Sequence, residues 1–223
     1  TAILPLCNYL VDVVREHYPK QNLHVFVEGI DSSKWYTEKG IELKHPCVGL
    51  VQRAHHWAKS SEMLILKKIL DKMPEVNFYW AGGGEIEDEI LSELDGFENF
   101  HWLGSLQYPD KVREFLSEID VYLLPTGMET TPLSLKEAQL MKKPVITTNV
   151  GGTSETMIDG VTGFLVEKGN HEQLIEKLEL LVDDKKLSEQ MGEAGRKFVQ
   201  EKFSMEFSVK NCLNIIRQYH NQK

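Results

Sequence analysis

Two glutamates separated by seven residues flank the start of one predicted helix. Pro132 opens this helix as its first residue, Glu129 precedes it, and Glu137 lies about one and a half turns inside. A helix start leaves backbone amides unpaired, here those of residues 133–135, and such amides bind anions. Carboxylates beside an anion site suit the hydroxyls at both ends of a ligand with a central phosphate, such as a sugar and a ribose. The residues alone also allow a solvated Glu137 and a Glu129 that only complements the helix dipole.

Cations that could balance a diphosphate lie upstream of these glutamates. Residues 34–72 hold eight Lys or Arg and four acids, against the acidic trend of the chain. Arg53 follows a predicted strand, and Lys59 lies at the start of the next helix, where a cation opposes the helix dipole. An anionic ligand shared by the two would explain this placement. A solvated surface lysine is the alternative.

Two glycine clusters also follow predicted strands. Gly82 and Gly84 fit the start of a dinucleotide fingerprint, but Glu87 stands where the third glycine belongs. Residues 85–98 add seven acids and no Lys or Arg, which would repel a pyrophosphate. The first cluster therefore predicts a tight turn. The second, Gly151–Gly152, allows a ligand or another loop to approach the backbone, or forms an ordinary capped turn.

Strands alternate with helices along the chain. The apolar patterns predict strands over residues 23–27, 46–51, 76–81, 100–103, 120–125, 144–148 and 164–166. Helical spacing predicts helices over residues 3–18, 60–73, 86–94, 109–118, 132–141, 171–182, 185–199 and 205–219. We therefore expect an α/β fold with a Rossmann-like, doubly wound, mostly parallel sheet of about six strands and helices on both faces. Ligands bind such sheets at the carboxyl ends of the strands, where the residues above are placed.

The composition excludes several classes of protein. The chain has 25 basic and 34 acidic residues, a net charge of −9, 41% hydrophobic and 26% charged residues, which indicates a folded protein with a core and argues against nucleic-acid binding. No apolar run reaches the ~18 residues of a transmembrane segment, and the start lacks the basic region of a signal peptide. The three cysteines show no metal-site spacing, so we expect no metal, free thiols and a cytoplasmic location.

Four segments in one order carry a resemblance to a known family. They are Asp120-Val-Tyr-Leu-Leu-Pro-Thr, Glu129 with Glu137-Ala, residues 143–155, and Asp159-Gly-Val-Thr-Gly-Phe-Leu-Val. Together they resemble the carboxyl-terminal, donor-binding domain of retaining glycosyltransferases with the two-domain GT-B fold, most closely family four, or glycosyl transferases group 1. Residues 29–35 and 48–59 extend the match, which covers residues 23–220. Glu28 and Lys142 depart from the usual Asn and Gly of that family.

The resemblance implies a metal-independent enzyme without a cofactor, whose donor substrate is a nucleotide diphosphate sugar such as a UDP- or GDP-hexose. It also implies roles for the matching positions: the donor diphosphate for Arg53, Lys59, Thr131, Leu133 and Ser134; the hexose and the catalytic centre for Glu129; the ribose for Glu137; and the base for the turn Trp102-Leu103-Gly104.

The family's amino-terminal domain, which binds the acceptor, is expected to be missing from this chain. Residues 1–22 then form a helix or connector from that domain, residues 23–204 the nucleotide-sugar domain, and residues 205–223 a helix that packs back toward the missing part. The acceptor, whether glycan, lipid or small molecule, stays open, as does contact with a membrane through the missing domain. We expect this chain to bind nucleotide with little or no turnover. A non-catalytic module of the same fold and an NAD-dependent oxidoreductase are the alternatives.

Overall fold

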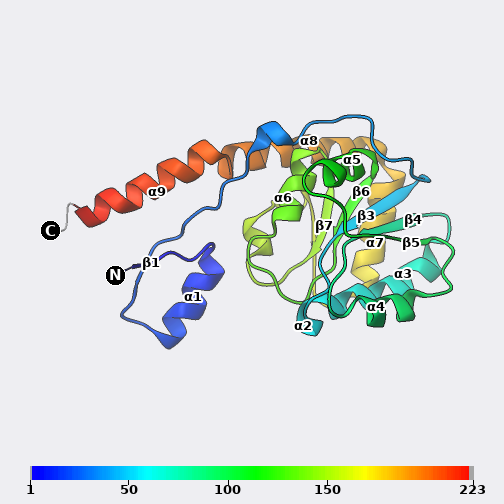
Figure 1. Ribbon diagram of the computed structural model, residues 1–223, viewed down its shortest axis with the longest axis horizontal. Helices are drawn as coiled ribbons and strands as arrows, with labels where there is room; N and C mark the ends of the chain where they lie inside the picture. The colour runs from blue at the N-terminus through cyan, green and yellow to red at the C-terminus, as the bar shows by residue number, and fades with distance from the viewer. Residues whose placement is uncertain (1, 221–223) are drawn as a thin grey trace.

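A single parallel sheet forms the centre of the computed structural model, which describes residues 2–220 (Figure 1). Within those residues its strand order is β5-β4-β3-β6-β7-β8. The strands are β3 (Cys47–Val51), β4 (Asn77–Ala81), β5 (Phe100–Gly104), β6 (Val121–Leu124), β7 (Val145–Thr148) and β8 (Gly163–Val166). The chain builds outward from β3 in one direction and from β6 in the other, so the switch point lies between these two strands. The predicted Rossmann-like α/β fold is confirmed.

Helices cover both faces of the sheet. One face packs against α3 (Leu66–Lys72), α4 (Glu87–Leu94) and α7 (His171–Asp183). The other face packs against α5 (Asp110–Glu118), α6 (Leu133–Leu140) and α8 (Lys185–Lys202). Successive strand residues point to opposite faces, so Phe78 and Trp80 are buried in the first core and Tyr79 in the second. A sheet covered on both sides keeps only the ends of its strands open to a ligand.

The amino-terminal segment corrects two predictions. Helix α1 covers only Asn8–His17, not residues 3–18, because Pro5 interrupts the helical pattern. Residues 23–27 do not join the main sheet: β1 (Ala2–Ile3) and β2 (Asn22–Leu23) pair in a separate two-stranded sheet. The backbone amide of Phe26 then donates to the carbonyl of Pro5, at 2.8 Å. This segment therefore lies beside the domain (Figure 1) and is joined to it by the Glu155 carboxylate, which accepts from the amides of Asn8 and Tyr9, each at 2.9 Å.

The predicted helix over residues 60–73 is divided into three pieces. The chain forms α2 (Trp57–Ser60), a 3₁₀ segment η2 (Ser61–Ile65) and then α3. Two further short 3₁₀ segments are η1 (Ser32–Lys34) and η3 (Thr153–Glu155). Because α2 begins at Trp57, Lys59 lies within a helix near the carboxyl ends of the strands, and not just before a helix that starts at residue 60.

Helix α9 (Met205–His220) leaves the domain and extends away from the sheet (Figure 1). Val209, Leu213 and Ile216 leave apolar side chains exposed along it. Its predicted packing toward another domain stays a prediction, as does the division at residues 22 and 204; residues 1 and 221–223 of that division lie outside the described part. Across residues 2–220, no helix combines the length and apolar character needed to cross a membrane.

Candidate functional site

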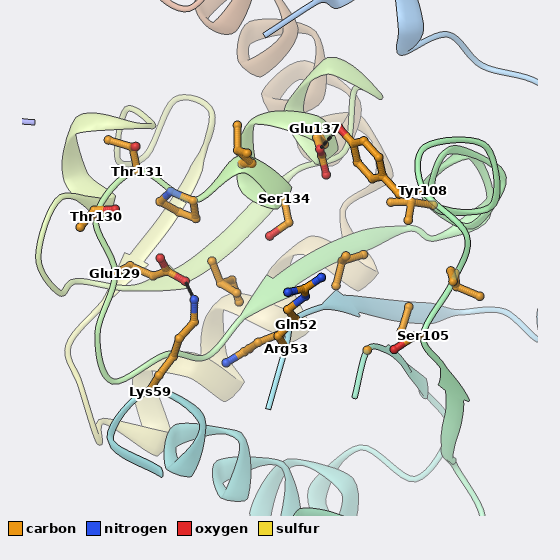
Figure 2. A pocket seen from close by; sticks show the side chains of 18 of the residues that line it. Gln52, Arg53, Lys59, Ser105, Tyr108, Glu129, Thr130, Thr131, Ser134 and Glu137 are labelled. Atoms are coloured by element: carbon orange, nitrogen blue, oxygen red, sulfur yellow. Dashed lines mark hydrogen bonds and ion pairs between the residues drawn. The ribbon is translucent and has the colours of Figure 1, made fainter. Parts of the chain in front are cut away.

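A cleft of about 570 Å³ opens at the carboxyl ends of β3, β4 and β6, beside the switch point (Figure 2). Figure 2 shows Glu129 and Glu137 at opposite ends of it, with Ser134 between them and Gln52 and Arg53 on the facing wall. The cleft brings together most of the predicted site residues: Arg53, Lys59, Glu129, Thr131, Leu133, Ser134 and Glu137.

The start of α6 supplies the predicted anion site, with a shift of one residue. Pro132 is the N-cap with extended backbone, φ −60° and ψ 120°, so the helix begins at Leu133. Pro109 takes the same capping place before α5. The first hydrogen bond of α6 runs from the amide of Lys136 to the carbonyl of Pro132, at 3.4 Å. The amides of residues 133–135 therefore have no partner within the helix, and Leu133 and Ser134 line the cleft.

Tyr122 of β6 holds the first turn of α6 through a hydrogen bond to Ser134. Its hydroxyl lies 2.7 Å from Ser134 Oγ and 3.2 Å from the carbonyl oxygen of Val51. Burial raises the pKa of Tyr122, so the hydroxyl stays protonated. This contact joins β3, β6 and α6 at the point where the predicted phosphate-binding amides begin.

Lys59 and Glu129 form an ion pair at one end of the cleft (Figure 2). Lys59 comes from α2, and Glu129 from the loop after β6. The pair brings a residue predicted to bind the diphosphate next to the residue predicted to contact the hexose.

Glycines hold the Glu129 loop between its neighbours. The amide of Gly127 donates to the carbonyl of Lys59 at 2.8 Å, and a Cβ on Gly127 would collide with the carbonyl of Ala58. Gly151 has φ +56°, and a Cβ there would collide with the carbonyl of Glu129. The second glycine cluster therefore serves the close approach of another loop, one of the uses that its sequence allows.

Glu137 lies at the other end of the cleft and is 4% exposed, which excludes a solvated helix residue. The Tyr108 hydroxyl donates a hydrogen bond to Glu137 Oε1 at 3.1 Å. Burial raises the pKa of Glu137 to about 7, while the Tyr108 hydrogen bond and the charge of Lys136 act in the opposite direction. A carboxyl group that titrates near neutrality inside a cleft is typical of a functional residue.

Two polar side chains in the cleft are buried without partners. Gln52 is 5% exposed, and neither its Nε2 nor its Oε1 has a hydrogen-bond partner among the described residues. Thr131 is 7% exposed, and its Oγ1 also lacks a partner within residues 2–220. A buried polar group left unpaired costs about 1–3 kcal/mol, so these atoms favour a ligand that completes them.

The sequence did not single out Gln52 or Tyr108. Gln52 could have been found from its position, because it is the first polar residue after the apolar run of β3, at the carboxyl end where ligands bind. Nothing in the local pattern around Tyr108 marks it, since its role depends on a helix that begins 25 residues later.

The remaining predicted positions divide into two groups. Arg53 is exposed at the end of β3, and its guanidinium has no ion pair with any described residue. Residues 102–104 lie in β5 rather than in a turn, and the cleft is lined instead by Ser105 and Leu106 just beyond them. A role of Trp102, Leu103 and Gly104 in base binding stays a prediction.

The first glycine cluster is occupied by structural contacts. The Glu87 carboxylate accepts a hydrogen bond from the amide of Gly84 at 2.8 Å, and Trp102 donates to the carbonyl of Gly82 at 2.9 Å. A carboxylate therefore holds the place that a dinucleotide phosphate would need. This contact supports the turn that the sequence predicts.

One group of potential metal ligands occurs in the described residues, at the amino end of the sheet. His45 Nδ1 lies 2.8 Å from Asp120 Oδ2, and 3.6 Å from Cys47 Sγ. Burial, followed by the charge of Asp120, raises the pKa of Cys47 to about 12, which disfavours a metal-binding thiolate. Asp120 also accepts from the Cys47 amide, so the group is explained as a hydrogen-bonded cap.

Comparison with protein families matches residues 31–198 to the family described as glycosyl transferases group 1. The chain is 44% identical over 90 residues to the capsular polysaccharide biosynthesis glycosyltransferase CapM of Staphylococcus aureus, covering 40% of this chain and 24% of that protein. It is 25% identical over 250 residues to alpha-maltose-1-phosphate synthase of Mycolicibacterium smegmatis, covering 97% of this chain and 63% of that protein. The chain thus spans less than two thirds of either relative.

The fold is shared with solved structures. The structure of Anabaena Alr3699/HepE in complex with UDP-glucose superposes with a TM-score of 0.78 and 17% identity, covering 99% of this chain and 64% of that chain. At this identity the likeness concerns the fold, and the chemistry must be argued from the residues in the cleft.

Proposed function

Because this chain belongs to glycosyl transferases group 1, we propose that its cleft binds a nucleotide diphosphate sugar, such as a UDP- or GDP-hexose, for transfer of the hexose with retention. One observation carries this proposal: two carboxylates stand at the ends of a cleft whose middle offers Arg53 and free helix amides, with Lys59 beside the carboxylate at one end. A ligand with hydroxyls at both ends and a diphosphate between them matches that order. The structure of HepE with UDP-glucose supports the choice of ligand, since that chain has the same fold.

Different residues of the cleft have different roles in the transfer. Arg53, Lys59 and the amides at the start of α6 bind the diphosphate and stabilise its charge as it leaves with the bonding electron pair. Glu129 contacts the hexose, whose anomeric carbon loses its bond to the diphosphate oxygen and bonds to the acceptor's hydroxyl oxygen, while the hydroxyl proton passes to the departing diphosphate. Glu137 accepts hydrogen bonds from the ribose hydroxyls and so fixes the nucleotide.

Buried polar atoms on both sides of the cleft contribute selectivity. Gln52 offers both a donor and an acceptor, and Thr131 a hydroxyl, to whatever group of the ligand lies against them. A ligand that lacks matching groups leaves these atoms buried and unpaired, and therefore binds less tightly.

In this proposal the chain acts as a carboxyl-terminal donor-binding domain, and a further amino-terminal domain binds the acceptor. The closing of one domain over the other excludes water from the reacting bond. The chain of 223 residues then binds nucleotide but turns over little or nothing.

Calorimetric titration of UDP, GDP and ADP into the protein tests the proposal. We expect at least one of the three to bind, and Arg53→Met to weaken that binding about tenfold or more, because a charge-assisted contact to phosphate is lost. Arg15→Met on α1 removes the same charge outside the cleft and is the matched control. Absence of binding by all three nucleotides at millimolar concentration would contradict the proposal.

A further inference from the structure

The Glu137 carboxylate depends on one hydrogen bond. Among residues 2–220 the Tyr108 hydroxyl is the hydrogen-bond donor found at it, on Oε1 at 3.1 Å (Figure 2). An ionised carboxylate has about four acceptor sites on two oxygens. The hydrogen bond from Tyr108 therefore orients the group and leaves Oε2 for hydroxyls of a ligand in the cleft.

The charges around Glu137 make this donor important. On its own helix, Lys136 is fully buried, but its Nζ lies 3.4 Å from Glu28 Oε2, so its charge is partly neutralised. From β6, Tyr122 faces the site as a neutral hydroxyl that is already engaged with Ser134. No other side chain in the described residues hydrogen-bonds to Glu137, so Tyr108 is its main local source of support as an anion.

The Tyr108 ring is held independently of Glu137. It lies in the loop between β5 and α5 and packs against the buried Trp35, with ring centroids 6.1 Å apart. The residue is 63% exposed and lines the cleft, so a ligand can reach the ring and the carboxylate together. Burial of the hydroxyl, followed by the charge of Glu137, raises the pKa of Tyr108 to about 12, so it remains a donor throughout the neutral range.

We propose that Tyr108 is a positioning residue for Glu137: its hydroxyl favours the ionised carboxylate and orients it so that it accepts hydrogen bonds from the ligand. The effect on the Glu137 carboxylate in the absence of a ligand depends only on its hydrogen bond with Tyr108. The effect on binding rests on the proposed function, in which Glu137 accepts from the ribose hydroxyls.

The first test follows Glu137 without a ligand. The ¹³C signal of its carboxyl group is titrated by NMR in the wild type and in Tyr108→Phe, with Glu137→Gln to assign the signal. We expect the midpoint to rise from about 7 by roughly one pH unit in the variant, since a lost hydrogen bond to a charged group is worth about 1.5 kcal/mol. Tyr18→Phe, on an exposed tyrosine outside the cleft, should leave the midpoint unchanged. An unchanged midpoint in Tyr108→Phe would overturn the proposal.

The second test measures the affinity for UDP, GDP or ADP between pH 6.5 and pH 9. Tyr108→Phe should bind about fivefold more weakly at pH 7, and equally well at pH 9, where Glu137 is ionised in both proteins. If Tyr108→Phe weakened binding by the same factor at every pH, the hydroxyl would contribute only a contact with the ligand. Its proposed effect on the charge of Glu137 would then be wrong. If no nucleotide binds the wild type, the proposed function fails, while the NMR titration still decides the role of Tyr108.

Discussion

The two ends of the sheet both carry hollows lined by polar groups, but they differ in how those groups are satisfied. At the amino end, Asp120 Oδ2 accepts from the amide of Cys47 at 2.8 Å and pairs with His45 at 2.8 Å. Lys143 beside them donates to the carbonyl of Ser117, also at 2.8 Å. At the carboxyl end, Gln52 and Thr131 are buried without partners in the described residues, and the amides of residues 133–135 are free of helical hydrogen bonds.

A candidate binding site differs from a structural cluster in whether its polar groups already have hydrogen-bond partners. The volume of the hollow does not make this distinction. The hollow at the amino end measures about 790 Å³ and the cleft at the carboxyl end about 570 Å³, so volume alone would favour the amino end as the binding site. Unpaired buried atoms lower the stability of the free protein. Three of the five such side-chain atoms found in the described residues belong to Gln52 and Thr131 in the cleft, and a ligand there would explain them; the other two, Gln139 Oε1 and His171 Nδ1, lie outside it.

The largest effect is expected at the amino end. Asp120→Ala removes two hydrogen bonds to a carboxylate and leaves the buried Cys47 amide unpaired. We expect the free energy of unfolding to fall by about 3–4 kcal/mol and nucleotide affinity to stay unchanged. Urea denaturation and calorimetry measure the two quantities, and Asp71→Ala on the exposed surface of α3 is the control. If Asp120→Ala abolished nucleotide binding in a protein that remained folded, the amino end would not be purely structural.

The next effect concerns Glu137 at the carboxyl end. Its pKa is raised to about 7 in the folded protein, so the native state binds this proton more tightly than the unfolded chain does. The free energy of unfolding should therefore fall as pH rises from about 4.5 to about 7, by up to about 3 kcal/mol. Glu137→Gln should remove this slope and weaken nucleotide binding about thirtyfold, or 2 kcal/mol. Urea denaturation at pH 5 and pH 8 measures the slope, which must persist in Tyr18→Phe.

Much of this arrangement could be predicted from local sequence. Strands buried on both faces read as continuous apolar runs, and Pro and Gly mark their ends, so the sequence predicts the sheet, and with it the positions of Glu129 before α6 and Glu137 within it. The strand predicted over residues 23–27 does not join this sheet, because its alternation indicates a strand without indicating which partner it pairs with. Pro5 supplies that partner from outside the domain.

The finer features of the site depend on contacts between distant loops. Tyr108 meets Glu137 only because the loop after β5 crosses toward α6, and Lys59 meets Glu129 only because α2 begins before the predicted helix. Neither contact can be predicted from the spacing of the residues in the sequence. The unpaired state of Gln52 is equally invisible in sequence, since it depends on what its neighbours fail to offer.

The smallest expected effect tests that unpaired state. Gln52→Leu replaces a buried amide without partners by an apolar side chain of similar size. We expect the free energy of unfolding to rise by about 1 kcal/mol and nucleotide affinity to fall, because the ligand loses the group that it would complete. A higher free energy of unfolding together with a lower affinity would show that Gln52 contributes to binding and not to stability.

Gln139 offers a matched control on α6. It is also fully buried and lies outside the cleft; its Oε1 has no partner among the described residues, but its Nε2 donates to the carbonyls of Thr156 at 2.9 Å and Leu135 at 3.3 Å. Gln139→Leu should therefore lower the free energy of unfolding by about 1 kcal/mol and leave nucleotide affinity unchanged. If Gln52→Leu destabilised the protein as Gln139→Leu does, an ordered water would already satisfy Gln52. The carboxyl end would then differ from the amino end in its free cation and amides alone, and Gln52 would have no part in selecting the ligand.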